Sequence, residues 1–147
     1  MLEFEIENQS INGRIGQKIV AYYDNDLVGR TGYLSFNPRY PPEEGKLATM
    51  GVVVFRDGKK IGASDGILVE QSYRKRKIGK ALLTELVQEA SRDYEKLMIY
   101  YGVPESKGFY EKVLTELKED GKIKDFKKII ISDEEGFYDY TIILNPA

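Results

Sequence analysis

The stretch 69–90 constrains the fold more than any other part of the sequence. A short apolar run at 67–69 ends abruptly and is followed by a polar loop rich in lysine and arginine. From Ile78 onward, apolar residues recur at the three- and four-residue spacing of one helix face. This order predicts a strand, a basic turn and an amphipathic helix over 78–90.

The basic turn predicts an anion site. The first turn of a helix carries unpaired backbone N–H groups and the positive end of the helix dipole. Basic side chains add to this field, namely Arg74, Lys75, Arg76, Lys77 and Lys80. Such a turn is typical of phosphate binding, although a basic loop that only faces solvent is the alternative. The sequence holds neither a Walker lysine motif nor GxGxxG, the signatures of nucleotide hydrolysis and dinucleotide binding.

Length and composition limit the other function classes. The 147 residues suit a single domain, 1–147. The absence of cysteine and histidine excludes thiolate catalysis and Ser-His-Asp triads, and we expect no metal site. The net charge of −2 disfavours a general nucleic-acid binder. The charged N-terminus and the short apolar runs predict neither a signal peptide nor a membrane span, so we expect a cytoplasmic protein.

The N-terminal half reads as strands joined by turns and loops. Alternating and β-branched residues predict strands at 2–7, 19–23, 27–36, 49–55 and 60–69. Turns are expected at 24–26 and at Asp57-Gly58, and the proline-rich segment 37–46 is expected to be a loop. The polar stretch 8–16 leaves little room for a helix.

The C-terminal half alternates strands and helices. Residues 96–101 predict a buried strand, and a crossover through the helix would place it parallel to the strand 60–69. A second helix is expected from Pro104 to a stop at Gly121, because Tyr110, Val113, Leu114 and Leu117 lie at helical spacing. The strands 128–132 and 138–145 are expected to form a hairpin through 133–136.

The basic turn resembles motif A of the GNAT superfamily of acetyl-CoA-dependent N-acyltransferases. In that motif a strand is followed by Arg or Gln, two residues, Gly, one residue, and Gly or Ala at the start of a helix. Two registers fit: Arg74-x-x-Lys77-x-Gly79, and Arg76-x-x-Gly79-x-Ala81 two residues later. We prefer the first because it keeps the family's distance from the strand, although Lys77 then stands where the family has glycine.

A second segment, SKGFYEKVL at 106–114, is similar to motif B of the same family. Ser106 takes the small-residue position and Tyr110 the tyrosine position. The resemblance implies an α/β (α+β) fold with a mostly antiparallel central sheet, a splayed parallel strand pair and two main helices. Family members usually have two helices after the first strand, which are reduced or absent in this chain.

The resemblance also implies a function. The chain would move an acetyl group from acetyl-CoA directly to a primary amine of a small molecule or a protein. Tyr110 would protonate the departing thiolate, and Asp65 or Glu70 would serve as the base. The cofactor-binding residues would be Ile67, Leu68 and Val69 along the pantetheine arm, and Arg74, Lys75, Arg76, Lys77, Ile78, Gly79, Lys80 and Ser106 elsewhere.

Two other interpretations stay open. A non-catalytic acyl-CoA-binding regulatory or interaction protein would keep the same fold and basic turn, and Lys77 and the missing helices are compatible with it. A nucleic-acid-binding module would use the run 74–80, but the net acidity and the lack of clustered aromatic residues at this loop disfavour it. We therefore expect an amine acceptor as the partner, with no nucleic acid or membrane, and a monomer or a homodimer.

Overall fold

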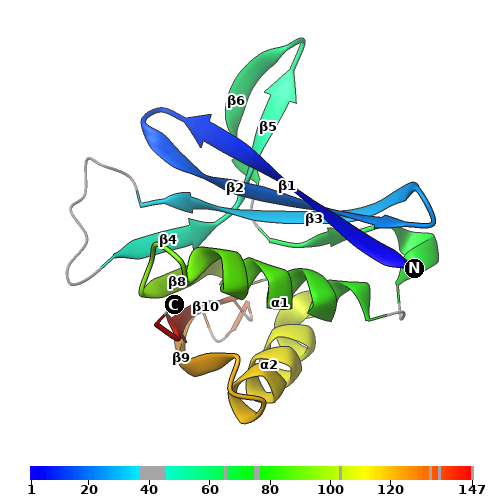
Figure 1. Cartoon of the computed structure of the whole chain (residues 1–147). Coiled ribbons are helices and arrows are strands. Elements are labelled where there is room, and N and C mark those ends of the chain that lie inside the picture. The colour runs from blue at the N-terminus through cyan, green and yellow to red at the C-terminus, as the bar shows by residue number, and fades with distance from the viewer. Residues whose placement is uncertain are drawn as a thin grey trace.

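The computed structural model describes residues 1–36, 46–64, 66–74, 77–102, 104–132, 134–135 and 137–146. Its main sheet runs in the order β1-β2-β3-β4-β8-β10-β9, with β7 also paired to β3. Helix α1 packs against β2 and β3, and α2 packs against β9 (Figure 1). In the described residues, neither helix is long and apolar enough to cross a lipid bilayer.

The sheet begins with a long hairpin at its edge. Strands β1 (Leu2–Ile11) and β2 (Arg14–Tyr23) pair antiparallel over their whole length, from Leu2 opposite Tyr23 to Ile11 opposite Arg14. They join at Asn12 and Gly13, whose φ angles of 49° and 81° are typical of a tight two-residue turn. The polar stretch 8–16, which was expected to leave little room for a helix, forms the paired ends of β1 and β2 and the turn between them. An edge strand exposes most of its side chains, so it can be polar and still belong to the sheet.

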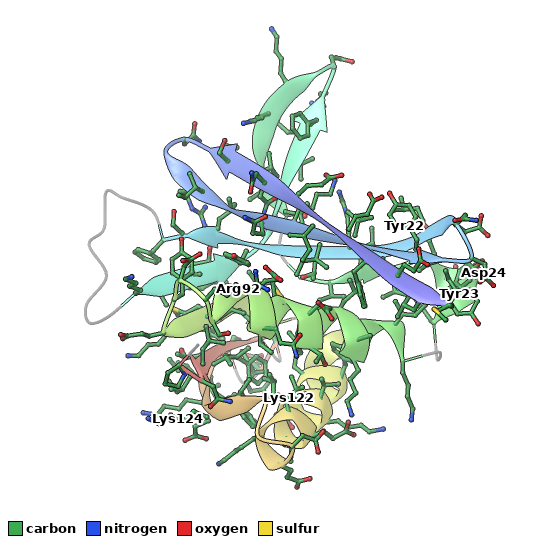
Figure 2. All side chains as sticks on the ribbon, viewed as in Figure 1. Tyr22, Tyr23, Asp24, Arg92, Lys122 and Lys124 are labelled. Carbon is green, nitrogen blue, oxygen red and sulfur yellow. The ribbon has the colours of Figure 1, made fainter. Side chains whose placement is uncertain are left out.

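Strand β3 (Asp26–Ser35) follows a second tight turn. Asp24 and Asn25 have φ angles of 49° and 73°, so the predicted turn is confirmed. Figure 2 shows Tyr22, Tyr23 and Asp24 gathered at this end of the sheet. The N-terminal ammonium group of Met1 binds Asp24 Oδ1 at 2.6 Å, which ties the start of β1 to the turn.

The rest of the main sheet is nearly all antiparallel. It contains β4 (Leu47–Met50), β8 (Lys96–Gly102), β10 (Phe137–Leu144) and β9 (Ile123–Ser132). Only β4 and β8 pair in parallel among the described strands. The predicted fold class, a mostly antiparallel sheet with one parallel pair and two helices, is confirmed. The parallel partner of β8 was expected in the strand 60–69, and this expectation was wrong.

The strand beside β3 is interrupted by an inserted hairpin. Met50 of β4 lies opposite Tyr33, and Val69 of β7 (Leu68–Val69) lies opposite Gly29 on the same strand β3. Strands β4 and β7 therefore run in one line, although 51–67 separates them in the sequence. Between them β5 (Val52–Arg56) and β6 (Lys59–Ser64) leave the main sheet as a two-stranded arm (Figure 1).

This insertion corrects two predicted strands. The segments 49–55 and 60–69 are each divided between the main sheet and the arm, and Gly51 and Gly66 lie near the points of division. A β-carbon on Gly51 would lie 3.1 Å from the carbonyl oxygen of Ser64, so glycine allows the two ends of the arm to approach closely. The Gly51 N–H still donates to Gly32 O at 2.8 Å, which keeps β4 in register up to that point.

The side chain of Gln9 fixes the base of the arm to the sheet. Its Nε2 donates to the carbonyl oxygens of Gln17, Tyr33 and Gly51 at 3.2, 3.0 and 3.0 Å. Its Oε1 accepts a hydrogen bond from the Val53 N–H at 3.0 Å. One amide thus satisfies backbone groups from β2, β3 and β5, which would otherwise be costly to leave unpaired in a part-buried position.

The two helices were predicted correctly because their apolar residues repeat locally. Helix α1 (Ile78–Ala90) buries Ile78, Leu82, Leu83, Leu86, Val87 and Ala90. Helix α2 (Pro104–Glu119) buries Tyr110, Val113, Leu114 and Leu117 in the same core. Each such aliphatic side chain contributes about 1.5–3 kcal/mol relative to exposure. Gly121, with φ of 72°, follows the end of α2, as the sequence predicted.

Candidate functional site

A cavity of about 690 Å³ opens where β7, the basic turn, α1 and α2 meet. Its lining includes eight of the predicted cofactor-binding residues and the predicted proton donor. The lining residues are Ile67, Leu68, Val69, Tyr73, Arg74, Lys77, Ile78, Gly79, Lys80, Phe109, Tyr110, Lys112, Val113 and Glu116. The fold therefore brings the strand end, the basic turn and the motif around Tyr110 to one place.

Strand β7 presents a backbone edge to this cavity. The Glu70 N–H donates to Val28 O at 2.8 Å, so Val28 and Glu70 form a hydrogen-bonded pair. In an antiparallel ladder such pairs alternate with pairs whose N–H and C=O groups point the other way. Val69, one residue before Glu70, accordingly directs its backbone groups away from β3. The Nε of Arg74 reaches the Val69 carbonyl from that side at 3.3 Å.

The turn between β7 and α1 contacts the β2–β3 hairpin at the end where its two strands are joined. It starts with a single 3₁₀ turn, η1 (Gln71–Tyr73). The Tyr73 hydroxyl donates to Asp26 Oδ2 at 3.2 Å, and its ring lies 5.9 Å from that of Tyr23. These contacts hold Arg74 at the cavity edge.

Lys77 starts α1 in a left-handed backbone conformation, with φ of 60° and ψ of 21°. Its side chain makes no capping hydrogen bond, so the first-turn N–H groups of the helix are not closed off by it. Glycine adopts this conformation without the cost that a β-carbon imposes. The geometry agrees with the register in which Lys77 occupies the glycine position of motif A.

Gly79 brings the two helices together. A β-carbon at this position would lie 3.1 Å from two ring atoms of Phe109 on α2. That distance is tighter than ordinary contact, so glycine allows the start of α1 to approach α2 closely. The approach shapes the wall of the cavity between the basic turn and Tyr110.

An ion pair spans the cavity between the helices. Lys80 Nζ on α1 lies 2.6 Å from Glu116 Oε2 on α2. The hydrogen bond to Glu116 raises the pKa of Lys80, and the hydrogen bond to Lys80 lowers the pKa of Glu116. Lys112 and Lys77 lower the Glu116 pKa further. Both members of the pair therefore remain charged.

Tyr110 lies at the buried part of the cavity. Only 4% of the residue is exposed, and its ring packs 5.3 Å from Phe109 and 5.6 Å from Tyr140. Its hydroxyl approaches Gly66, just before β7. Since Arg74 and Lys77 are exposed, the cavity extends from a basic opening to a buried phenol.

Comparison with known proteins decides the family. A family model described as acetyltransferase (GNAT) family matches residues 3–115. The chain belongs to the GNAT family. Membership of this family supports an acyltransferase activity that uses acyl-CoA. No curated protein sequence matches it.

Two solved structures are similar to this chain over most of its length. Ribosomal-protein-alanine N-acetyltransferase from Brucella melitensis is 17% identical, covers 88% of this chain and 69% of its own, and superposes with a TM-score of 0.56. An acetyltransferase of the GNAT family from Streptococcus pneumoniae is 12% identical over 92% of this chain and 70% of its own, with a TM-score of 0.43. The first of these supports the GNAT fold.

Several predicted residues of the GNAT site are not placed in the cavity. Asp65, Lys75 and Arg76 lie outside the described residues. Ser106 belongs to α2, but its side chain also lies outside the description. Glu70 is exposed at the end of β7 and does not line the cavity.

The cavity also contains residues that the sequence reasoning missed. Phe109, Lys112 and Glu116 of α2 line it together with Val113, which belongs to the apolar face already predicted. Their spacing of three and four residues is a helical signal, but it lies beside the apolar face that was used to predict the helix. Tyr73 was missed because its contact with Asp26 joins segments far apart in the sequence.

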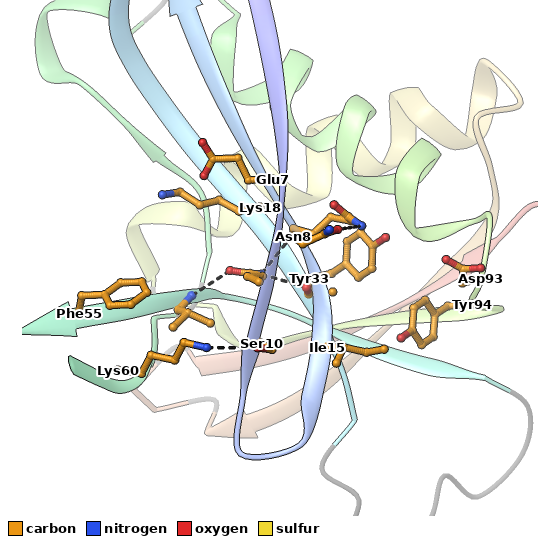
Figure 3. Close-up of a pocket in the computed structure, with 14 residues that line it drawn as sticks. Glu7, Asn8, Ser10, Ile15, Lys18, Tyr33, Phe55, Lys60, Asp93 and Tyr94 are labelled. Atoms are coloured by element: carbon orange, nitrogen blue, oxygen red, sulfur yellow. Dashed lines mark hydrogen bonds between the residues drawn. The ribbon is translucent and has the colours of Figure 1, made fainter. Parts of the chain in front are cut away.

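A second cavity, of about 510 Å³, lies between the β1–β2 hairpin, the inserted arm and the segment at Asp93 and Tyr94 (Figure 3). Many of its polar groups bind one another. Lys60 Nζ donates to Ser10 Oγ at 3.2 Å, and Gln17 Nε2 donates to Asn8 Oδ1 at 2.8 Å. Together with the Gln9 contacts, these hydrogen bonds join the arm to the sheet along this cavity.

Among the described residues no group of three Asp or Glu side chains could hold a metal ion.

Proposed function

We propose that this GNAT protein transfers an acetyl group from acetyl-CoA to a primary amine of a small molecule or a protein. The observation that carries the proposal is the continuity of one cavity. It joins the open first turn of α1, the outward-facing backbone edge at Val69 and the buried Tyr110. The phosphate groups of acetyl-CoA would lie at the first turn of α1, its pantetheine arm would lie along Val69, and its thioester would lie near Tyr110.

The start of α1 would hold the pyrophosphate of the cofactor. The N–H groups of Ile78, Gly79 and Lys80 open the helix, where backbone donors and the helix dipole favour anions. Arg74, Lys77 and Lys112 add positive charge at the same cavity. Lys75, Arg76 and Ser106 remain proposed contacts from the family resemblance.

Strand β7 would hold the pantetheine arm. The arm contains amide groups, which can pair with a strand edge as another strand would. Leu68 and Val69 lie opposite Arg30 and Gly29 of β3. By the alternation of hydrogen-bonded pairs, Val69 would be the one whose backbone groups are available to the arm. Ile67 and Leu68 would supply apolar contact from their side chains.

The chemistry would be direct transfer. The neutral amine attacks the thioester carbonyl carbon, a C–N bond forms, and the resulting oxyanion is stabilised by a hydrogen-bond donor. The C–S bond then breaks, the thiolate takes a proton from Tyr110, and the amine gives its proton to a base or to water. We favour Asp65 over Glu70 as that base, because Asp65 precedes Gly66, which faces Tyr110, and Glu70 lies outside the cavity lining.

A ligand screen tests the proposal. Thermal unfolding is measured with acetyl-CoA, coenzyme A, NAD and an oligonucleotide. We expect stabilisation by acetyl-CoA and coenzyme A only, and a ligand at about 100 times its dissociation constant adds roughly 2.7 kcal/mol. The absence of any shift at millimolar acetyl-CoA would overturn the proposal.

A second measurement separates transfer from binding. The protein and acetyl-CoA are incubated with a panel of primary amines and amine-bearing peptides, and acetylated products are detected by mass spectrometry. Product that depends on the protein supports the enzyme. A protein that binds acetyl-CoA and acetylates nothing across a broad panel would support the regulatory alternative instead.

A further inference from the structure

We propose that Glu116 is an internal anion that competes with the cofactor's phosphate groups for Lys80. This inference rests on the proposed function, because it assumes that the cavity binds a CoA thioester. In the free protein the Glu116 carboxylate occupies the basic cluster between α1 and α2. An entering phosphate displaces it, so Glu116 lowers cofactor affinity and selects ligands with enough negative charge to replace it.

The first support is the geometry of the pair. The 2.6 Å contact between Lys80 Nζ and Glu116 Oε2 joins two side chains that both line the cavity. Their side chains are 36% and 30% exposed, so a ligand from solvent can reach the pair. An ion pair that is open to solvent and screened by salt contributes little to stability. Replacement of the Glu116 carboxylate by a phosphate at Lys80 is therefore feasible.

The second support is the charge balance of the cavity. Its described lining contains four cationic side chains, Arg74, Lys77, Lys80 and Lys112, and only one carboxylate, Glu116. Lys80, Lys112 and Lys77 all act on that carboxylate and depress its pKa. The carboxylate thus lies where the lysines of both helices converge, which is also the most favourable place for a phosphate.

The third support is the effect of a fixed carboxylate on an arriving anion. A phosphate that binds Lys80 while Glu116 stays in place would meet a like charge at close range, which is unfavourable even in a partly wet site. Movement of Glu116 relieves this repulsion but gives up its ion pair. Either way the carboxylate subtracts from the binding free energy of a polyanion, and it leaves an uncharged ligand unaffected.

The test compares two matched variants. Glu116→Gln removes the charge in the cavity and keeps the size of the side chain. Glu111→Gln removes the same charge from the same helix and breaks a similar exposed ion pair, the 2.8 Å contact with Lys128, but Glu111 does not line the cavity. Calorimetric titrations use acetyl-CoA, inorganic pyrophosphate and uncharged pantetheine at low and high salt.

We expect Glu116→Gln to bind acetyl-CoA and pyrophosphate about twofold to fivefold more tightly than wild type at low salt. The gain should shrink at high salt because exposed charges are screened. Pantetheine affinity should stay the same, and Glu111→Gln should behave like wild type with every ligand. Circular dichroism confirms that both variants are folded.

Unchanged acetyl-CoA affinity in Glu116→Gln would overturn the inference, and so would an equal gain in Glu111→Gln. Weaker binding in Glu116→Gln would also overturn it, because Glu116 would then position Lys80 for the phosphate. These outcomes all require that wild type binds acetyl-CoA. Failure of wild type to bind would refute the proposed function itself, so the two failures are distinguishable.

Discussion

The hydroxyl oxygen of Tyr110 lies 3.6 Å from the position that a β-carbon would take on Gly66. Gly66 has a φ of 93°, which L-amino acids with side chains rarely adopt, and its carbonyl accepts a hydrogen bond from Thr31 Oγ1 at 3.3 Å. The glycine is thus held in a conformation that suits it, and it leaves room beside the proposed proton donor. The backbone conformation of Gly66 and its lack of a side chain therefore both affect the space beside Tyr110.

We predict that Gly66→Ala lowers both stability and turnover. Backbone strain at positive φ should reduce the free energy of unfolding by about 1–2 kcal/mol, and relief of that strain should shift the backbone that the Tyr110 hydroxyl approaches. Gly58→Ala is the control, because Gly58 has a φ of 76° but open space around its β-carbon. Denaturant unfolding and steady-state kinetics should show that both variants lose stability and only Gly66→Ala loses turnover. Equal turnover loss in both would contradict the prediction.

Tyr110→Phe should slow turnover with little effect on acetyl-CoA affinity. The change removes one hydroxyl and keeps the buried ring against Phe109 and Tyr140. General acids contribute about 10²–10⁴-fold, and we expect the low end because a thiolate leaves fairly well without a proton. The loss should appear in kcat, because the proton is needed in the transition state. Wild-type kcat, with chemistry shown to limit the rate, would return Tyr110 to a packing role.

At position 77, Gly should give a more stable protein than Ala. Both substitutions remove the lysine charge, so their difference reports the backbone conformation alone. Since Lys77 has φ of 60° at the start of α1, Lys77→Gly should exceed Lys77→Ala in unfolding free energy by about 1 kcal/mol. Urea denaturation of the two variants measures this. A more stable Ala variant would show that the left-handed conformation is not required there.

Stability should decline at alkaline pH partly because of Tyr140. Burial, with a smaller contribution from Glu111 and Tyr138, raises the pKa of Tyr140 to about 12 from an ordinary value of 10.0. The folded state therefore disfavours the phenolate. The stability that this pKa difference contributes to the folded state is complete below pH 10 and is lost as the pH rises toward 12. Burial likewise raises the pKa of Tyr33 to about 12.

Tyr140→Phe isolates that effect. The Tyr140 hydroxyl is buried without a hydrogen-bond partner among the described residues. Its removal should change stability at neutral pH by less than about 1 kcal/mol and should flatten the decline between pH 10 and 12. Thermal unfolding across this range, compared with the phenolate absorbance, checks the prediction. An unchanged alkaline decline would assign the loss to other groups.

Local patterns in the sequence predicted the helices and the basic turn. The apolar residues of α1 repeat at helical spacing, and the buried set matches that face. The two segments that resemble the family motifs meet in one cavity, since a strand–turn–helix unit places its helix start beside the strand end. These features depend on residues close together in the chain, so a single sequence contains the necessary signal.

The division of the strand beside β3 could not be predicted in this way. The segments 49–55 and 60–69 are β-branched or strand-like throughout, and nothing local shows which residues pair with Tyr33 and which pair within the arm. Register between distant strands depends on which faces become buried. The ion pair between Glu116 and Lys80 was missed for a similar reason, because the two residues lie on different helices.

The interrupted strand has a consequence for how the protein folds. Strand β7 reaches its place on β3 only after the chain has left the sheet at Gly51, formed the β5–β6 arm and returned. Closing such a loop costs entropy before β7 makes any contact, and contacts between distant segments form slowly. Strand β7 should therefore dock late in folding, after β3 and β4 have paired. The cavity would then be among the last parts of the molecule to form.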